Sequence, residues 1–227
     1  MPDPRPDPRP DPRMELTENL VVLTGDLVGS TKLAPADLAE AMRALEAGSR
    51  ELAGAWSGGE ARFSAFRGDG WQCLAPAPRL ALRAALLLRA RLGALGRQFD
   101  TRISIGVGRG WLPQDRQLNA ASGPAFEISG RGLDAMEHAR RFAIAWERPP
   151  ADAALLRAVL ALADEVSRNW TPGQSRVFAR LLLERQRPSQ AALARDLDVT
   201  QQAVASHLAG GGDWALQEAL RAVEEAG

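Results

Sequence analysis

The chain has 227 residues, of which 45% are hydrophobic and 25% are charged, as is typical of a soluble globular protein. Its 28 basic and 28 acidic side chains cancel, so no overall charge draws it to nucleic acid or to an anionic membrane. The single cysteine, Cys73, excludes an internal disulfide and a cysteine-based zinc site. No apolar run approaches the roughly 20 residues that cross a bilayer. We therefore expect a cytoplasmic protein.

The first thirteen residues contain the unit Pro-Asp-Pro-Arg three times and are followed by Met14. Proline removes the hydrogen bonds that helices and sheets need, and the repeated unit is polar and of low complexity. We expect residues 1–13 to form a disordered tail with polyproline II character. An alternative explanation is that translation begins at Met14.

Residues 14–148 are expected to form the main domain. The apolar run at 19–26 is typical of a buried strand, and an apolar stripe at helical spacing follows at 36–56. Two alternating runs joined around Asp69-Gly70 predict a β-hairpin. A helix, a strand, a helix and a final strand are then expected at residues 79–97, 101–110, 124–141 and 142–147.

This order of elements predicts the fold class. It is βαββ, followed by a helix, a strand, a further helix and a last strand, so it contains the ferredoxin-like βαββαβ unit. We expect an α/β fold, an α+β sandwich whose sheet contains antiparallel pairs and carries its helices on one face.

The C-terminal third reads as helical throughout. Prolines at 149 and 150 mark a boundary, after which we expect a connecting helix within residues 149–170 and a small all-α domain at 171–227. One helix is expected to end at residues 181–183. The segments "PSQAALARDL" and "TQQAVASHLA" predict a second and a third helix, which meet at the short turn "LDVT". Thr200 is a good N-cap for the second, and the glycines at 210–212 end it. Together these signals predict a helix-turn-helix.

Two aspartates carry the main chemical hypothesis. Asp26 ends the first strand and Asp69 lies in the hairpin turn, so both carboxylates can meet at one edge of the sheet. Neighbouring carboxylates repel each other unless a cation lies between them, and Mg²⁺ or Mn²⁺ takes one or two carboxylates plus phosphate oxygens. Gly29, Ser30 and Thr31 follow Asp26 and would present backbone N–H groups to phosphate. The sequence therefore predicts a corner that binds metal and phosphate.

Four segments resemble motifs of class III nucleotidyl cyclases. "GDLVGST" (25–31) resembles the first metal-binding motif of that family, and "FRGDGW" (66–71) resembles the second. "RISIGVGRG" (102–110) resembles the strand that follows them, and "GPAFEISGR" (123–131) resembles the Gly-x-Ala-Val-Asn-x-x-x-Arg helix. The order and spacing agree over residues 17–147.

This resemblance implies a cyclase-like fold with a nucleotide site, in which Asp26 and Asp69 hold the metal and Arg131 stabilises the transition state. Because the family takes its metal aspartates from one subunit and its arginine from the other, the resemblance also implies a head-to-tail homodimer. The chain departs from the pattern at two positions. Glu127 stands where the family has a catalytic asparagine, and Ala65 stands where it has the lysine that selects the base.

The chain also resembles the SatD-type proteins, which are small bacterial proteins with a "GD" first strand, a "GD" hairpin, a "GPAF" helix and a C-terminal helix-turn-helix. Gln72, three residues after Asp69, fits the glutamine that follows the hairpin in that pattern. This second resemblance implies a nucleotide site coupled to a DNA-binding module.

The helix in "TQQAVASHLA" would be the recognition helix, and it offers polar side chains for contacts with base edges. The candidate DNA-binding residues are Thr200, Gln201, Gln202, Ser206 and His207. Phosphate anchoring needs arginine or lysine, which the preceding segment supplies as Arg176, Arg180, Arg185 and Arg187. The alternative is that the three short helices form a packing or dimerisation module.

Each site residue also has a purely structural explanation. Asp26 can cap a helix or form an Asx turn, and Asp69 belongs to an Asp-Gly pair, the commonest hairpin turn. Arg131 and Glu127 can be solvated surface charges. Cys73 is expected to face inward from its strand and to be inert.

We therefore predict a nucleotide- and metal-binding domain coupled to a DNA-binding helix-turn-helix, which acts as a transcriptional regulator and forms a homodimer. The expected partners are a nucleotide or another phosphate ligand and DNA, and no membrane. The alternative is an active nucleotidyl cyclase or another two-metal phosphoryl-transfer enzyme, in which the metals activate the ribose hydroxyl and neutralise the leaving pyrophosphate. A third possibility is an interaction scaffold without a ligand.

Overall fold

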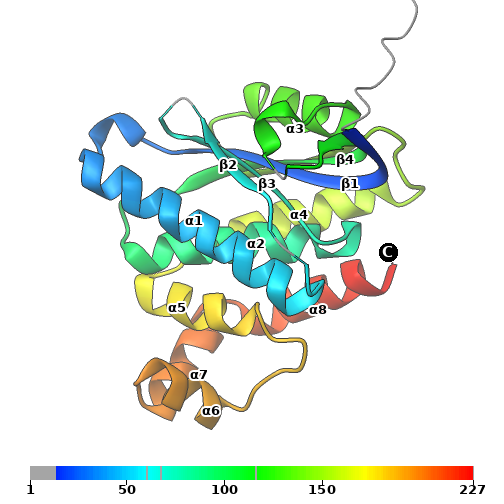
Figure 1. The fold of residues 1–227 in the computed structure, drawn as a ribbon. Helices are drawn as coiled ribbons and strands as arrows, with labels where there is room; N and C mark the ends of the chain where they lie inside the picture. Colours follow the sequence, from blue (N-terminus) through cyan, green and yellow to red (C-terminus); the bar gives the residue numbers. More distant parts are fainter. Residues whose placement is uncertain (1–13, 60, 67, 116, 227) are drawn as a thin grey trace, which may run out of the picture.

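The computed structural model describes residues 14–59, 61–66, 68–115 and 117–226, so the tail expected at 1–13 lies outside the described part. Figure 1 shows a twisted sheet with α1 and α2 on one face and α3 on the other, and further helices beyond α2. The sheet has five strands in the order β2-β3-β1-β4-β5. The predicted α/β fold with antiparallel pairs in its sheet is therefore confirmed.

The strands are close to those predicted, with two longer than expected. Their bounds are β1 (Met14–Leu27), β2 (Phe63–Phe66), β3 (Gly70–Leu74), β4 (Thr101–Pro113) and β5 (Phe142–Trp146). β1 pairs antiparallel with β3 and with β4, and β5 runs parallel to β4. β1 begins at Met14 rather than at residue 19 because its first residues pair with the second half of β4, where Met14 lies opposite Pro113.

The long helices are α1 (Pro35–Trp56), α2 (Ala81–Leu95), α3 (Pro124–Asp134), α4 (Ala153–Arg168), α5 (Pro172–Leu181), α6 (Gln190–Leu197), α7 (Gln201–Gly210) and α8 (Asp213–Ala226). Three short 3₁₀ turns are η1 (Ser30–Lys32), η2 (Pro78–Leu80) and η3 (Leu118–Ala120). None of the helices in the described part of the chain is long and apolar enough to cross a membrane.

α2 forms the middle of the core. Its consecutive residues Leu86, Leu87 and Leu88 are all buried, which requires neighbours on every side of the helix. The sheet supplies one neighbour and α5 the other, and at Gly93 the two helices approach so closely that a Cβ would collide with the side chain of Ser175. The helix consequently buries residues on every side rather than along one stripe.

α3 covers the opposite face of the sheet, so the expectation of helices on one face only is wrong. Leu20 and Val22 of β1 pack in a separate apolar cluster with Ala125 of α3. Gly106 of β4 permits this contact, because a Cβ there would collide with the carbonyl oxygen of Ala125. The helix ends at Asp134 rather than at residue 141, since the chain must turn back before β5 begins.

The C-terminal helices share the core of the α/β unit. One apolar cluster contains Ile105 of β4, Phe178 of α5, Val204 of α7 and Leu220 of α8. α8 begins directly after the glycines at 210–212, where the sequence analysis assigned no further helix. The domain boundaries expected at 148 and 170 stay predictions.

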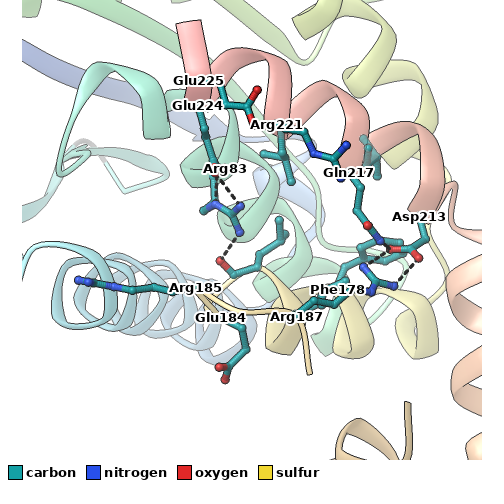
Figure 2. A pocket seen from close by; sticks show the side chains of 14 residues that line it. Arg83, Phe178, Glu184, Arg185, Arg187, Asp213, Gln217, Arg221, Glu224 and Glu225 are labelled. Carbon is teal, nitrogen blue, oxygen red and sulfur yellow. Dashed lines mark hydrogen bonds and ion pairs between the residues drawn. The ribbon is translucent and has the colours of Figure 1, made fainter. Parts of the chain in front are cut away.

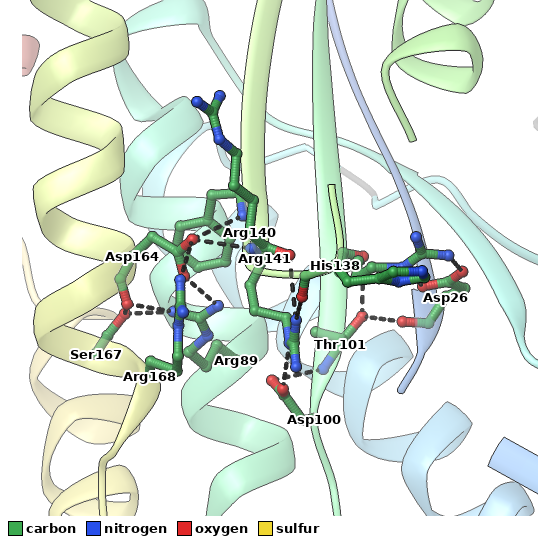
Figure 3. Close-up of polar contacts among 12 residues, drawn as sticks. Asp26, Arg89, Asp100, Thr101, His138, Arg140, Arg141, Asp164, Ser167 and Arg168 are labelled. Carbon is green, nitrogen blue, oxygen red and sulfur yellow. Dashed lines mark hydrogen bonds and ion pairs between the residues drawn. The ribbon is translucent and has the colours of Figure 1, made fainter. Parts of the chain in front are cut away.

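A buried arginine joins α2 to α4 (Figure 3). Arg89 of α2 donates from Nη2 to Oδ1 of Asp164 at 2.8 Å and from Nη1 to Oγ of Ser167 at 2.6 Å. Its guanidinium lies 3.8 Å from the ring centroid of Phe142. Burial lowers the pKa of Arg89, although the charge of Asp164 opposes this effect.

Asp164 also accepts hydrogen bonds from the main chain at the start of β5. Its Oδ2 accepts from the N–H of Arg141 at 2.9 Å, from the N–H of Phe142 at 3.2 Å and from the guanidinium of Arg168 at 3.0 Å. Burial raises the pKa of Asp164, but the charge of Arg89 and the N–H group of Arg141 outweigh burial, and the net pKa is lowered. This carboxylate therefore fixes α4 to the edge of the sheet.

We expect Asp164→Asn to lower the free energy of unfolding by about 3 kcal/mol, because it leaves the buried charge of Arg89 without a counter-charge. Urea denaturation measures this change, and Glu165→Gln at the exposed neighbouring position is the matched control. The pKa of Asp164 is lower in the folded than in the unfolded protein. The carboxylate therefore adds fully to the free energy of unfolding above its unfolded pKa, and this addition is lost as the pH falls through its folded pKa. Wild type and Asp164→Asn should converge in acid. Equal stabilities at neutral pH would contradict this account.

Candidate functional site

The structure brings the two predicted metal aspartates to the same end of the sheet. Asp26 lies near the end of β1, directly opposite Gly70 of β3 and Arg102 of β4. The N–H group of Leu27 donates to the carbonyl oxygen of Asp69 at 3.2 Å, which ties the hairpin turn to the end of β1. The main chains of the two predicted site residues are therefore neighbours.

The carboxylate of Asp26 is already paired with a guanidinium. Nε of Arg102 donates to Oδ1 of Asp26 at 2.9 Å, and Nη2 of Arg102 donates to Oδ2. The two side chains are 22% and 26% exposed, so solvent screens the pair only in part. The hydrogen bond with Asp26 raises the pKa of Arg102, partial burial opposes it, and the charges of Asp26, Asp134 and Asp69 add to it.

Asp69 is bound by the loop that follows β1. Oγ of Ser30 donates to Oδ2 of Asp69 at 2.5 Å. Gly29 has φ 68° and ψ 25°, a left-handed conformation that a residue with a Cβ adopts only with strain. The next three residues form the single turn η1, so the loop makes a sharp corner beside Asp69.

The loop leaves several backbone donors available. Its hydrogen bonds use the N–H groups of residues 27, 28, 32 and 33, which donate to carbonyl oxygens of Asp69, Asp100, Gly29 and Ser30. Within the part of the chain that the structure describes, no recorded hydrogen bond uses the N–H groups of Gly29, Ser30 or Thr31. Successive unpaired N–H groups after a left-handed residue form a concavity that suits an anion.

Arg131 and Glu127 lie on the outer side of α3 and pair with each other. Their side chains are 70% and 64% exposed, and Nη1 of Arg131 is 3.3 Å from Oε2 of Glu127. Among the described residues, no recorded contact joins Arg131 to Asp26 or Asp69. Their predicted catalytic roles stay predictions, since one chain alone does not bring them to the corner.

Gln72 takes part in a polar layer between the sheet and α3. Its Nε2 donates to Oγ1 of Thr24 at 2.8 Å, and Thr24 is hydrogen-bonded to Oγ of Ser129 on α3 at 2.7 Å. Gln72 therefore helps to seat α3 on the sheet. On the other face, burial raises the pKa of Cys73 to about 12, partly opposed by a hydrogen bond with Ser49, and this agrees with an inert, inward-facing thiol.

The candidate DNA-binding residues lie at and along α7. Oγ1 of Thr200 accepts from the N–H of Ala203 at 3.1 Å and caps the helix. The side chains of Gln201, Gln202 and Ser206 are exposed, whereas His207 is half-buried against α5. A Cβ at Gly173 of α5 would lie 2.6 Å from Cε1 of His207. α6 and α7 are joined by three residues, beginning with Asp198 in the left-handed conformation.

Most of the arginines proposed to anchor DNA phosphates have partners within the chain. Arg180 pairs with Glu184 and with Asp196, and Arg187 pairs with Asp213. Nε of Arg185 donates to the carbonyl oxygen of Ala55 at 2.6 Å. Arg176, Arg185, Arg187 and Arg195 are exposed, and among the described residues Arg176 and Arg195 have no ion pair or side-chain hydrogen bond.

Arg102 is the functional residue that sequence reasoning missed. Its neighbour Thr101 begins β4, and antiparallel pairing with β1 places Arg102 opposite Asp26. Residues directly opposite each other in a sheet project their side chains to the same face. The sequence therefore contained both partners of this ion pair, but predicting the pair required the register between β1 and β4.

A charged cavity lies between α2, α5 and α8, away from the predicted site (Figure 2). Its volume is about 280 Å³. Arg83 donates to both carboxylate oxygens of Glu224 and to the carbonyl oxygen of Leu182, and Arg187 pairs with Asp213. Because Arg83 and Arg187 already have counter-charges and Arg185 donates to the carbonyl oxygen of Ala55, this cavity resembles a helix junction more than an anion site.

The residues at the corner fit a divalent cation only in part. In the described ranges, no cluster of three or more His, Cys, Asp or Glu side chains is arranged to hold a metal ion. Asp69 has one carboxylate oxygen with no recorded partner there, whereas both oxygens of Asp26 accept from Arg102. A cation that also binds phosphate oxygens would find one oxygen of Asp69 available as a ligand. The carboxylate of Asp26 would become available only after Arg102 had moved away.

No protein-family model matches the chain, and no curated protein matches it. Among solved structures, the guanylyl cyclase Cya2 matches with a TM-score of 0.41 and 17% identity, over 58% of this chain and 76% of its own. The catalytic core of a rhodopsin-guanylyl cyclase with converted specificity, in complex with ATPalphaS, matches with a TM-score of 0.42 and 14% identity, over 58% of this chain and 79% of its own. Similarity at this level assigns no function to the chain.

Proposed function

We propose that the corner between β1, the hairpin turn and the loop after β1 binds the phosphate groups of a nucleotide. The observation that carries this proposal is the loop itself. Among the described residues, the N–H groups of Gly29, Ser30 and Thr31 have no hydrogen-bond partner, and the hydroxyl of Ser30, which donates to Asp69, lies beside them. Backbone N–H groups and a hydroxyl are the donors that phosphate-binding loops use.

The charge of the corner calls for a cation that accompanies the phosphate. Asp26 pairs with Arg102, and the charges of Asp134 and Asp69 also raise the pKa of Arg102, so the corner is rich in acidic groups. A phosphate group adds further negative charge, which the loop donors alone do not compensate. Mg²⁺ or Mn²⁺ would be held by Asp69, joined by Asp26 when Arg102 releases it, and would supply that positive charge.

We propose that the corner of one chain binds the nucleotide and that a second copy of the chain completes the site. Arg131 is exposed on α3 and makes no recorded contact with the corner among the described residues. A head-to-tail homodimer would bring Arg131 of one copy to the corner of the other. Its pairing with Glu127 would then have to break, which is inexpensive at such exposure.

We expect at least one nucleoside triphosphate to bind saturably in the presence of Mn²⁺, and Asp69→Asn to weaken this binding about tenfold because it removes a negatively charged ligand. Calorimetry with each triphosphate measures the affinity, and Glu165→Gln is the control for the loss of an exposed acid. Mass spectrometry of the same mixtures separates binding from turnover, since a cyclic product lost in Asp69→Asn would make the protein a cyclase. Flat titrations with all four triphosphates would refute the proposal.

We expect Arg102→Gln to strengthen Mn²⁺ binding, because it frees the carboxylate of Asp26 for the cation. The gain should disappear in the double variant Arg102→Gln/Asp26→Asn, which removes the released carboxylate as well. Electron paramagnetic resonance of free Mn²⁺ measures the affinity directly. If Arg102→Gln binds Mn²⁺ no better than wild type, Arg102 does not compete with a cation at this corner.

We further propose that α6 and α7 form a helix-turn-helix that binds DNA, so that the protein acts as a transcriptional regulator. The three-residue connection between the helices and the exposure of Gln201, Gln202 and Ser206 support this proposal. Glutamine and serine contact base edges. Of the nearby arginines, Arg180 and Arg187 form ion pairs and Arg185 is hydrogen-bonded to the carbonyl oxygen of Ala55. The electrostatic part of binding should therefore be small.

We expect the protein to bind the promoter of its own operon with a salt dependence of only about two counterions per chain. Arg176 and Arg195 are the exposed arginines near α7 that have no partner among the described residues, whereas Arg185 and Arg187 are already engaged. Gln201→Ala/Gln202→Ala should abolish the preference for this promoter over random duplex, and Gln98→Ala is the matched control. Fluorescence anisotropy at several salt concentrations measures both quantities. A double variant that keeps its promoter preference would exclude α7 as the reading helix.

A further inference from the structure

A second cavity lies toward the other end of the sheet from the Asp26 corner. Its volume is about 320 Å³, within the range of small-molecule sites. Val107 of β4 lines it, five residues along the strand from Arg102, which pairs with Asp26. The cavity is therefore separate from the proposed nucleotide site.

The body of this cavity is apolar and is built from four parts of the fold. Val107 and Ile144 come from the sheet, Leu82 from α2, Leu160 from α4 and Val223 from α8. Three of these side chains, at positions 82, 107 and 160, are buried members of the main core cluster, so the wall is rigid. Trp146 adds an aromatic surface on β5.

The rim of the cavity carries a net positive charge. Arg79 precedes α2 and Arg148 follows β5, and both are exposed. One acid, Asp152 at the start of α4, lines the same rim. Within the described residues, Arg79, Arg148 and Asp152 form no ion pair. A third arginine, Arg157, lies over the ring of Trp146, with its Cζ atom 5.3 Å from the ring centroid.

We infer that this cavity binds a small amphipathic anion, which is a compact aliphatic or aromatic body that ends in a carboxylate. The apolar part would replace water against Leu82, Leu160 and Val107, and this removal of apolar surface from water drives binding. The carboxylate would accept charge-assisted hydrogen bonds from Arg79 and Arg148 at the rim. A cationic or neutral head group would not form these charge-assisted hydrogen bonds with Arg79 and Arg148.

Such a ligand would touch the sheet, α2, α4 and α8 at the same time. It would stabilise the packing of α4 and α8 against the sheet by the free energy of its own binding. The inference does not depend on nucleotide binding, because none of the corner residues lines this cavity.

Isothermal titration calorimetry of the full chain with hexanoate, octanoate and decanoate tests the inference. We expect saturable 1:1 binding of at least one of these acids, and weaker binding of 1-octanol and octylammonium. Arg79→Gln/Arg148→Gln should weaken the binding of the carboxylate about tenfold or more, because each lost partner was a hydrogen bond to a charged group. Arg97→Gln, at the other end of α2, is the matched control.

A second variant blocks the cavity without altering its charge. Leu156→Trp places a larger side chain at the half-buried lining position on α4 and should abolish binding, while thermal melting confirms that the variant folds. Hydrogen exchange with octanoate present should show added protection in α4 and α8. Absence of saturable binding by all three acids, equal binding of octanoate and 1-octanol, or binding that survives Leu156→Trp would each overturn the inference.

Discussion

The position of β1 in the middle of the sheet decides where every side chain of the proposed nucleotide site lies. Its register places Asp26 opposite Gly70 on one side and opposite Arg102 on the other. A shift of one residue in either pairing would turn Asp26 to the face beneath α1 and α2, away from Arg102. The hydrogen bond from Leu27 to the carbonyl oxygen of Asp69 then holds the hairpin turn at the same corner.

The start of β4 links this corner to the C-terminal helices (Figure 3). Oγ1 of Thr101 donates to the carbonyl oxygen of Asp26 at 2.7 Å, and the carbonyl oxygen of Asp100 accepts from the N–H of Val28 at 2.9 Å. The carboxylate of Asp100 accepts from Nε of Arg141 at 2.6 Å, and the N–H of Arg141 donates to Asp164. A change at the loop after β1 therefore has a continuous polar route to α4.

The sequence was sufficient for the order of elements up to α7 and for the arrival of the Asp26 and Asp69 main chains at one end of the sheet, because turn signals and alternating apolar residues are local. It was not sufficient for features that depend on contacts between distant segments. α3 can lie on the opposite face because Gly106 has no side chain to collide with it. This role of Gly106 cannot be recognised until the helix is known to cross the strand at that residue. The pairing of Asp26 with Arg102 likewise depends on strand register, and the internal pairing of Arg180 and Arg187 depends on how α5 to α8 fold together.

The central claim is that the corner of Asp26, Asp69 and the loop after β1 receives a cation together with nucleotide phosphate. A crystal structure with Mn²⁺ and a non-hydrolysable nucleoside triphosphate, read through the anomalous signal of manganese, tests this most directly. The account predicts an anomalous peak bonded to Asp69, phosphate oxygens against the N–H groups of residues 29–31, and Arg102 displaced from Asp26. A nucleotide bound elsewhere, or a peak absent from this corner while Arg102 still holds Asp26, would contradict it.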